Sequence, residues 1–295
     1  MSAQLIDGKV IAEQIHSETK AEVDKLALRG IKPGIGLVRV GDDPASVVYV
    51  GAKGKACEKL GIYSENHILP ASTTQKQLLE LLDVLNASKK IHGILVQSPL
   101  PNQINEELIF QSVSPAKDVD GFHPVNIGKL LMGETDGFWP CTPAGVQQLL
   151  IRSGVKIEGA HVVVVGRSNI VGKPVAAILV QKAKHADATV TICHSRTRNL
   201  AEITRTADIL VAAMGRPKAI TADMVREGVV VIDVGVNRIP DATRPKGERL
   251  VGDVDFDAVK EKASRITPVP GGVGPMTIAM LMHNTVKACR QQTIA

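Results

Sequence analysis

The sequence predicts a two-domain α/β protein with mainly parallel sheets. Short apolar segments such as GIGLVRV (34–40) and VVVV (162–165) alternate with longer helix-like segments, a rhythm typical of parallel strands covered by helices. The 295 residues, 44% of them hydrophobic, exceed the usual size of one domain. The periodicity weakens over residues 122–143, among glycines, prolines and the single tryptophan, so we expect the domain junction there.

The first half reads as one α/β unit. Asp7 can cap a helix that ends near Gly30. Its predicted apolar side consists of Val10, Ile11, Ile15, Val23 and Leu26. Further helices are expected from the GDDP turn to about Leu60 and over 75–85, and strands at 34–40, near 67–69 and at 93–97.

In the second half, apolar strands are expected at 162, 188, 208 and 229. Short buried strands in this arrangement suit a doubly wound, Rossmann-type nucleotide-binding domain. Near the end, TPVPGGVGPMT has three prolines and three glycines over residues 268–275. Such a stiff loop can bring backbone donors close to a ligand, with Pro275 starting the final helix; the alternative is a purely structural helix entry.

Composition narrows the classes of partner. The net charge is +5, but no run of five basic residues occurs, and four Phe, two Tyr and one Trp are too few for a stacking platform. We therefore expect a mildly basic surface and no nucleic-acid partner. The N-terminal segment does not resemble a secretory signal, and no stretch approaches the roughly 18 apolar residues of a membrane span. A cytoplasmic enzyme without a membrane partner is expected.

The cysteines are too widely spaced to indicate a metal or redox centre. Cys57, Cys141, Cys193 and Cys289 form no CxxC pair. We expect four buried free thiols in a reducing compartment, and no bound metal.

The turn in VVVVGRSNIVGKP resembles a nucleotide-binding fingerprint with its second glycine missing. Gly166 closes the strand, the next glycine is Gly172, and Arg167 and Ser168 stand between them. Arg167 can hold a phosphate by a charge-assisted contact and Ser168 by its hydroxyl. An ordinary strand–turn–helix with an exposed arginine is the alternative.

The following strand, ATVTIC, bears on the choice of cofactor. An NAD-selective domain usually has an acid at the end of this strand to accept the ribose hydroxyls. Here His194, Ser195 and Arg196 follow instead. This favours the 2′-phosphate of NADP, unless Arg196 is simply a solvated loop residue.

In the first half, Tyr49 and Lys53 lie four residues apart on a predicted helix and share one side of it. Such a pair can flank a flat heterocycle, the ring stacking while the amine handles protons. Lys53, Lys55 and Lys59 would alternatively form a solvated surface. Gln97 ends a strand at the edge where ligands of open α/β sheets bind, and PAKDVDGF (115–122) is a polar loop with two acids.

Several motifs together resemble one enzyme family. They are YVGAKGKA, GILVQSPLP, KDVDGFHP, PCTPAG, VVVVGRSNIVGKP, VIDVGVNR, GDVDF and TPVPGGVGPMT. In this order they are similar to the methylenetetrahydrofolate dehydrogenase/methenyltetrahydrofolate cyclohydrolase family of the bacterial FolD type, from about residue 5 to 290.

The resemblance implies a bifunctional enzyme of one-carbon metabolism that supplies purine and amino-acid biosynthesis. It would oxidise 5,10-methylenetetrahydrofolate with NADP and hydrolyse the product to 10-formyltetrahydrofolate. The chain would be a homodimer, each subunit having two α/β domains that flank a cleft. Residues 1–140, joined by a C-terminal helix over 272–295, would form the folate-binding catalytic domain, and 141–271 the NADP-binding Rossmann domain.

The resemblance also implies roles for individual residues. Lys53 matches the essential lysine, Gln97 its partner, Tyr49 the tyrosine that packs on folate, and Asp120 the acid that recognises the pterin amino group; these four are the expected catalytic residues. The other expected folate contacts are Val50, Val96, Ser98, Pro270, Gly271, Gly272, Val273, Gly274, Pro275, Met276 and Thr277. The expected NADP contacts are Gly166, Arg167, Ser168, Ser195 and Val236, with Arg196 added from its charge.

Two other classes share some of these features. A shikimate-dehydrogenase-like hydride-transfer enzyme has the same two-domain plan and a catalytic lysine, but does not require the PGGVGPMT loop. A catalytically silent nucleotide sensor or nucleic-acid-binding protein would account for the basic charge, and salt-sensitive DNA binding would support it.

Overall fold

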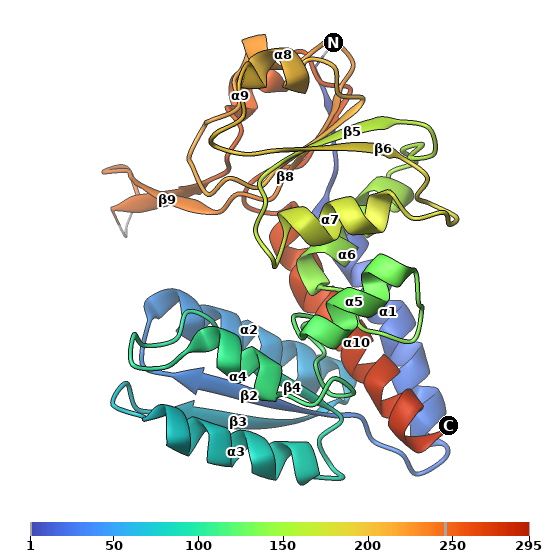
Figure 1. Cartoon of the computed structure of the whole chain (residues 1–295), viewed down its shortest axis with the longest axis vertical. Coiled ribbons are helices and arrows are strands. Elements are labelled where there is room, and N and C mark those ends of the chain that lie inside the picture. The colour runs from blue at the N-terminus through green and yellow to red at the C-terminus, as the bar shows by residue number, and fades with distance from the viewer. Residues whose placement is uncertain (1, 245–246, 295) are drawn as a thin grey trace. The chain divides into compact units, whose positions relative to one another are not determined.

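The computed structural model describes residues 2–244 and 247–294 (Figure 1). The chain divides into two compact units, and each is described by itself. Unit 1 contains the described residues up to Ala12 and Thr142–Thr277, while unit 2 contains Glu13–Cys141 and the described residues from Ile278 onward.

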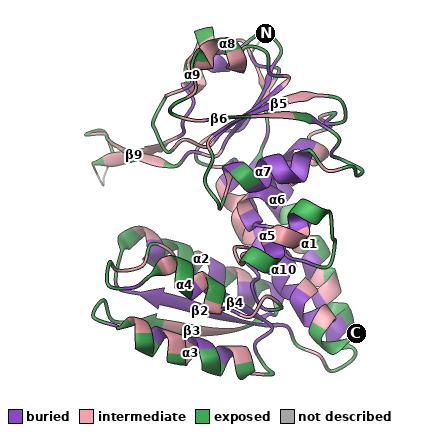
Figure 2. Cartoon of the chain, in the orientation of Figure 1, coloured by how far each residue is buried: buried purple, intermediate pink, exposed green. Residues whose placement is uncertain are grey.

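Unit 2 is built on a three-stranded parallel sheet in the order β3-β2-β4. Its strands are β2 (Gly34–Val40), β3 (Tyr63–Leu69) and β4 (Gly93–Val96). Its helices include α2 (Pro44–Leu60), α3 (Gln75–Ala87), α4 (Glu106–Ser112) and α5 (Pro124–Met132). The central strand β2 is buried along its whole length (Figure 2). Val38 and Val40 pack with Leu78 and Leu82 of α3 in the core beneath one side of the sheet.

Three further helices are α1 (Gly8–Ala27), α6 (Cys141–Arg152) and α10 (Val273–Thr293). Asp7 caps α1 as predicted, since its carboxylate accepts the N–H groups of Lys9 and Val10. The predicted apolar side is buried except at Val10, which is 56% exposed. At about 100° per residue Val10 lies opposite Leu26, so its assignment to the buried side was wrong.

Unit 1 contains a six-stranded sheet in which every pairing is parallel, in the order β1-β11-β8-β7-β5-β6. Its strands are β1 (Gln4–Leu5), β5 (His161–Val165), β6 (Thr189–Cys193), β7 (Ile209–Ala212), β8 (Val230–Asp233) and β11 (Arg265–Ile266). Its short helices are α7 (Gly172–Leu179), α8 (Leu200–Thr204), the 3₁₀ turn Ala222–Met224 and α9 (Phe256–Val259). The predicted α/β class with a mainly parallel, doubly wound sheet is confirmed.

The strand order places a topological switch point at β5. The chain runs from β5 to its neighbour β6 and then crosses to β7 on the other side of β5. The loops that leave β5 and its neighbours therefore diverge at their carboxyl ends. In open α/β sheets this divergence opens the crevice in which ligands bind.

Several elements were not predicted. Helix α4 and the antiparallel pair β9 (Asn237–Pro240) and β10 (Glu248–Val251) are short and rich in polar residues, and helix α5 is short and interrupted by a glycine. The last helix begins at Val273, two residues before the predicted start at Pro275. Pro275 fits inside its first turn because the first N–H groups of a helix have no partner within it.

All four cysteines are buried and free, as predicted. Across residues 2–244 and 247–294, every helix is too short or too polar to cross a membrane.

Candidate active site and nucleotide-binding edge

A buried lysine and a glutamine form the centre of the candidate site in unit 2. Lys53 lies on the buried side of α2 and is 6% exposed, and Gln97 directly follows β4. The Lys53 Nζ donates a hydrogen bond of 2.9 Å to Gln97 Oε1. The Gln97 amide donates to the Ser98 carbonyl at 2.6 Å, so its orientation is fixed with the oxygen toward the lysine.

The surroundings of Lys53 favour its neutral form. Burial lowers the pKa of Lys53, and the Asp120 carboxylate, followed by Cys141, opposes that change. Burial likewise raises the pKa of Asp120, with Lys53 acting in the opposite direction. The pKa values of Lys53 and Asp120 are thus displaced toward one another, as is common for groups that handle protons.

Asp118 holds the loop that carries Asp120. Its buried carboxylate accepts the backbone N–H groups of Gly121, Phe122 and His123. The Asn126 amide donates to the same carboxylate at 2.8 Å. These bonds fix the backbone on both sides of Asp120, so the acid is held by a rigid turn rather than by a free loop.

The last helix contributes a second clamp. Asn284 Nδ2 donates to the Val119 carbonyl at 2.9 Å and to the Trp139 carbonyl at 3.1 Å, and Cys141 Sγ donates to the same Val119 carbonyl at 3.3 Å. Sequence reasoning missed Asp118, Cys141 and Asn284 as neighbours of the site. A polar Asn in the apolar stretch MTIAMLMHNT was the one signal available for Asn284.

The other predicted folate contacts of unit 2 lie around this pair. Tyr49 is one turn before Lys53 on α2 and is 38% exposed, whereas Val50 and Val96 are buried. The Ser98 hydroxyl donates to the Glu106 carboxylate. The structure thus brings Lys53 and Gln97 into contact, and leaves the Tyr49 ring partly open to solvent.

The predicted loop Pro270–Thr277 belongs to unit 1 and packs closely there. A Cβ atom at Gly8 would overlap the carbonyl oxygen of Gly272, and one at Gly272 would lie 2.6 Å from the Pro268 oxygen. The Thr277 hydroxyl lies 2.8 Å from that of Thr142. Met276 is fully buried. Gly272 therefore serves close backbone packing within unit 1, whereas a Cβ atom at Gly274 would meet no neighbour within 4 Å.

The turn after β5 needs both of its glycines. Gly166 has a φ of 143°, and an added Cβ would overlap the Ala213 carbonyl oxygen; at Gly172 it would overlap the carbonyl oxygen of Gly166. Ser168 Oγ accepts the N–H of Val171 at 3.1 Å, which holds the entry to α7. Arg167 is exposed on this turn.

The remaining predicted nucleotide contacts lie at the same edge of the sheet. Ser195 and Arg196 are exposed in the loop after β6. Cys193 is the last residue of β6, and its carbonyl accepts the N–H of Gly166 at 2.9 Å. Val236 follows β8 and is 49% exposed. The six residues predicted to contact NADP thus lie beyond the carboxyl ends of β5, β6 and β8.

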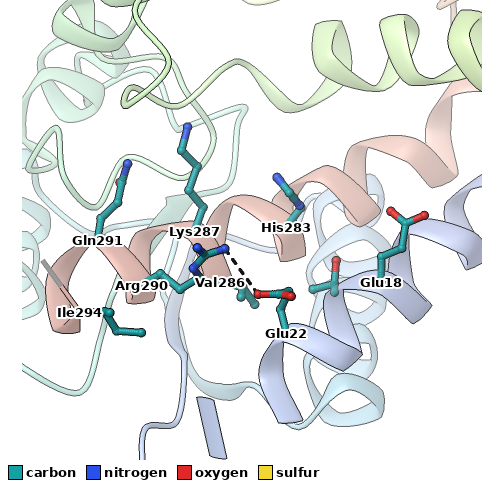
Figure 3. A pocket seen from close by; sticks show the side chains of 9 residues that line it. Glu18, Glu22, His283, Val286, Lys287, Arg290, Gln291 and Ile294 are labelled. Atoms are coloured by element: carbon teal, nitrogen blue, oxygen red, sulfur yellow. Dashed lines mark hydrogen bonds and ion pairs between the residues drawn. The ribbon is translucent and has the colours of Figure 1, made fainter. Parts of the chain in front are cut away.

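A separate hollow of about 720 Å³ lies in unit 2 between α1 and α10 (Figure 3). Charged side chains line it, among them Glu22 and Arg290, which pair at 3.4 Å. Lys287 donates to the Thr135 and Gly137 carbonyls. None of the predicted folate or nucleotide contacts is among its lining residues.

The chain combines a doubly wound sheet and its nucleotide-type turn with a buried lysine–amide pair. These two features define a two-domain nucleotide-dependent enzyme with an acid–base site. Two family models match the chain. The tetrahydrofolate dehydrogenase/cyclohydrolase catalytic domain matches residues 6–120, and the NAD(P)-binding domain of the same family matches residues 140–293. The chain belongs to the tetrahydrofolate dehydrogenase/cyclohydrolase family.

Individual relatives agree with this. "Bifunctional protein FolD" of Dehalococcoides mccartyi (strain CBDB1) is 62% identical over 293 residues, covering 99% of this chain and 98% of the relative. A bifunctional FolD from Campylobacter jejuni superposes with a TM-score of 0.92 at 47% identity, covering 98% of this chain and 99% of the other. The Trypanosoma brucei enzyme, complexed with NADP cofactor and inhibitor, has a TM-score of 0.94 at 40% identity over 100% of both chains.

These comparisons confirm the family predicted from the motifs. The chain is a bifunctional enzyme of folate metabolism with dehydrogenase and cyclohydrolase domains, and it acts on tetrahydrofolate derivatives. The two alternatives, a shikimate-dehydrogenase-like enzyme and a silent nucleotide- or nucleic-acid-binding protein, are accordingly set aside.

Proposed function

We propose that this enzyme oxidises 5,10-methylenetetrahydrofolate with NADP⁺ and then hydrolyses 5,10-methenyltetrahydrofolate to 10-formyltetrahydrofolate. The observation that carries the proposal is the buried Lys53 bonded to Gln97, in the segment that matches the family's catalytic domain. The roles of the individual residues are part of this proposal. So is the division into a folate-binding domain, residues 1–140 with 272–295, and an NADP-binding domain, residues 141–271.

The dehydrogenase step demands alignment rather than acid–base chemistry. NADP⁺, when bound, accepts a hydride from the bridging methylene of the folate, which becomes an amidinium-like cation. Gly166 and Gly172 keep side chains away from the turn, and Arg167, Ser195 and Arg196 offer cationic and hydroxyl groups at the same edge. This set suits a nucleotide with several phosphates. Exposed Tyr49 would stack on the folate.

The cyclohydrolase step needs a base that is neutral near pH 7. Water adds to the methenyl carbon and gives one proton to the Lys53 amine, whose pKa burial lowers. The resulting ammonium delivers its proton to N5 as the C–N5 bond breaks, and the remaining hydroxyl proton passes to solvent. Gln97 keeps the amine pointed at the reacting carbon, and Asp120 binds the pterin amino group.

The cyclohydrolase rate should rise with pH until Lys53 is neutral. Because burial lowers the pKa of this amine, we expect the rise to be complete below the pH at which an exposed lysine titrates. Lys53→Arg should be inactive across the range, since a guanidinium stays protonated. A pH–rate profile of methenyl hydrolysis measures both. A flat profile for the wild type, or hydrolysis by Lys53→Arg at the wild-type rate, would contradict the assignment.

Arg196 should discriminate NADP⁺ from NAD⁺. A charge-assisted contact to the 2′-phosphate contributes about 1.5–3 kcal/mol, so Arg196→Ala should raise the KM for NADP⁺ about 10- to 100-fold and leave that for NAD⁺ unchanged. Arg198→Ala, exposed two residues further on, is the matched control. Equal effects on both nucleotides would remove Arg196 from phosphate recognition.

The enzyme would work as a homodimer in the cytoplasm, where its four buried free thiols stay reduced. Light scattering on the eluting protein should give twice the mass of 31.4 kDa. A monomer at working concentrations would contradict the dimer.

An assay of the cyclohydrolase activity alone tests the proposed function without any nucleotide. Purified enzyme is mixed with 5,10-methenyltetrahydrofolate, the loss of its absorbance is followed, and the product is identified by mass. We expect hydrolysis well above the buffer rate, with 10-formyltetrahydrofolate as product. A rate equal to buffer would overturn the proposal.

A further inference from the structure

Two buried aspartates lie in the motifs VIDVGVNR and GDVDF, which the proposed mechanism leaves without a role. Asp233 is the last residue of β8 and Asp253 follows β10; they are 3% and 0% exposed. Buried carboxylates are costly unless backbone or side-chain donors surround them. Their partners show what they hold in place.

Asp253 holds the loop after β7. Its Oδ2 accepts the N–H groups of Met214 and Gly215, and its Oδ1 accepts that of Arg216 at 2.9 Å. The Asn237 amide donates to Oδ1 at 2.8 Å. One carboxylate therefore joins the loop beyond β7 to the loop beyond β8.

Asp233 holds Asp253 in turn. Its Oδ1 accepts the N–H groups of Gly235 and Asp253, and its Oδ2 accepts that of Val254. A Cβ atom at Gly235 would overlap the Asp253 carboxylate, and one at Gly252 would overlap the Asp233 carboxylate. Each motif thus supplies a glycine that makes room for the aspartate of the other, which accounts for both glycines.

The loop held by Asp253 packs directly against the nucleotide-type turn after β5. The Ala213 N–H donates to the Val165 carbonyl at 2.8 Å, and Gly166 approaches the Ala213 carbonyl so closely that no Cβ fits between them. The next residue, Met214, is the one whose N–H binds Asp253. On the other side, Val236 lies between Gly235 and Asn237, which the two aspartates fix.

Burying the carboxylates of Asp233 and Asp253 costs free energy of desolvation. Burial raises the pKa of Asp233 to about 6, with a smaller contribution from the Asp253 carboxylate. Groups with a displaced pKa, such as Asp233, cluster at functional sites.

We propose that Asp253 and Asp233 are positioning residues of the nucleotide site: they fix the loops beneath Gly166 and around Val236, so that the site is formed before NADP⁺ arrives. The inference rests on the proposed function of this edge. Without the aspartates these loops would have to be ordered on binding, which weakens affinity. The cyclohydrolase chemistry at Lys53 would be unaffected.

Asp253→Asn tests this, because the amide leaves only one of the two oxygens as an acceptor. Calorimetric titration with NADP⁺ should show a Kd at least 10-fold above wild type, while hydrolysis of 5,10-methenyltetrahydrofolate stays within twofold. Asp257→Asn, an exposed neighbour, should change neither. An unchanged Kd, or equal losses of binding and hydrolysis, would overturn the inference.

Asn237→Ala provides a milder variant that decides the matter if Asp253→Asn does not fold. It removes one donor to Asp253 and should weaken NADP⁺ binding severalfold at unchanged hydrolysis; no change in affinity would count against the inference. Failure of the proposed function is distinguishable, because wild-type protein would then neither bind NADP⁺ nor hydrolyse the methenyl substrate.

Discussion

Replacing Lys53 with methionine should lower the cyclohydrolase rate about 10²- to 10⁴-fold, the usual contribution of a positioned general base. Methionine keeps most of the volume of the buried stem but removes the amine that Gln97 orients. Because hydride transfer needs alignment rather than this proton, NADPH formation should continue, and the methenyl intermediate should accumulate. Stopped-flow absorbance of the two chromophores measures both.

Lys55→Met is the matched control for this prediction. Lys55 lies on the same helix but is exposed, so its replacement should leave both activities near wild type. If Lys53→Met kept full cyclohydrolase activity, or if both lysine variants lost it equally, the assignment of the base would be wrong.

Gly172→Ala should abolish tight NADP⁺ binding and destabilise unit 1. The added Cβ would overlap the carbonyl oxygen of Gly166, and two backbone segments cannot separate without distorting the turn. Overpacking of this kind typically costs about 1–3 kcal/mol. Thermal unfolding with and without NADP⁺ measures both effects: we expect a lower Tm and the loss of nucleotide-dependent stabilisation.

Gly128→Ala, within α5, serves as the comparison. No neighbour lies within 4 Å of an added Cβ there, and alanine is favoured over glycine in a helix by about 1 kcal/mol. Its Tm should rise slightly, with nucleotide stabilisation intact. A Gly172→Ala variant that behaves in the same way would show that the turn tolerates a side chain.

Local pattern was enough to predict the elements with strong periodicity. The VVVV strand, the GIGLVRV strand and the helix with Tyr49 and Lys53 four residues apart all form as expected, because buried strands and one-sided helices leave a direct trace in the sequence. The short polar strands β9 and β10 leave no such trace, since their pairing depends on the partner strand rather than on their own composition.

Contacts between distant residues account for what sequence reasoning missed at the site. Asn284 bonds to Val119 across 165 positions, and the bonds of Asp253 to residues 214–216 span up to 39. Neither set of contacts can be recognised from a local pattern in the sequence. The family motifs marked the right segments, but only the folded chain shows that the VIDVGVNR and GDVDF motifs interlock through their aspartates and glycines.

The most direct test of the account is an absorbance assay with 5,10-methylenetetrahydrofolate, supplying NADP⁺ in one cuvette and NAD⁺ in another. We predict turnover with NADP⁺, a clear preference over NAD⁺, and little accumulation of the methenyl intermediate because Lys53 removes it. Turnover only with NAD⁺ would contradict the assignment of Ser195 and Arg196, and no turnover with either nucleotide would contradict the dehydrogenase function itself.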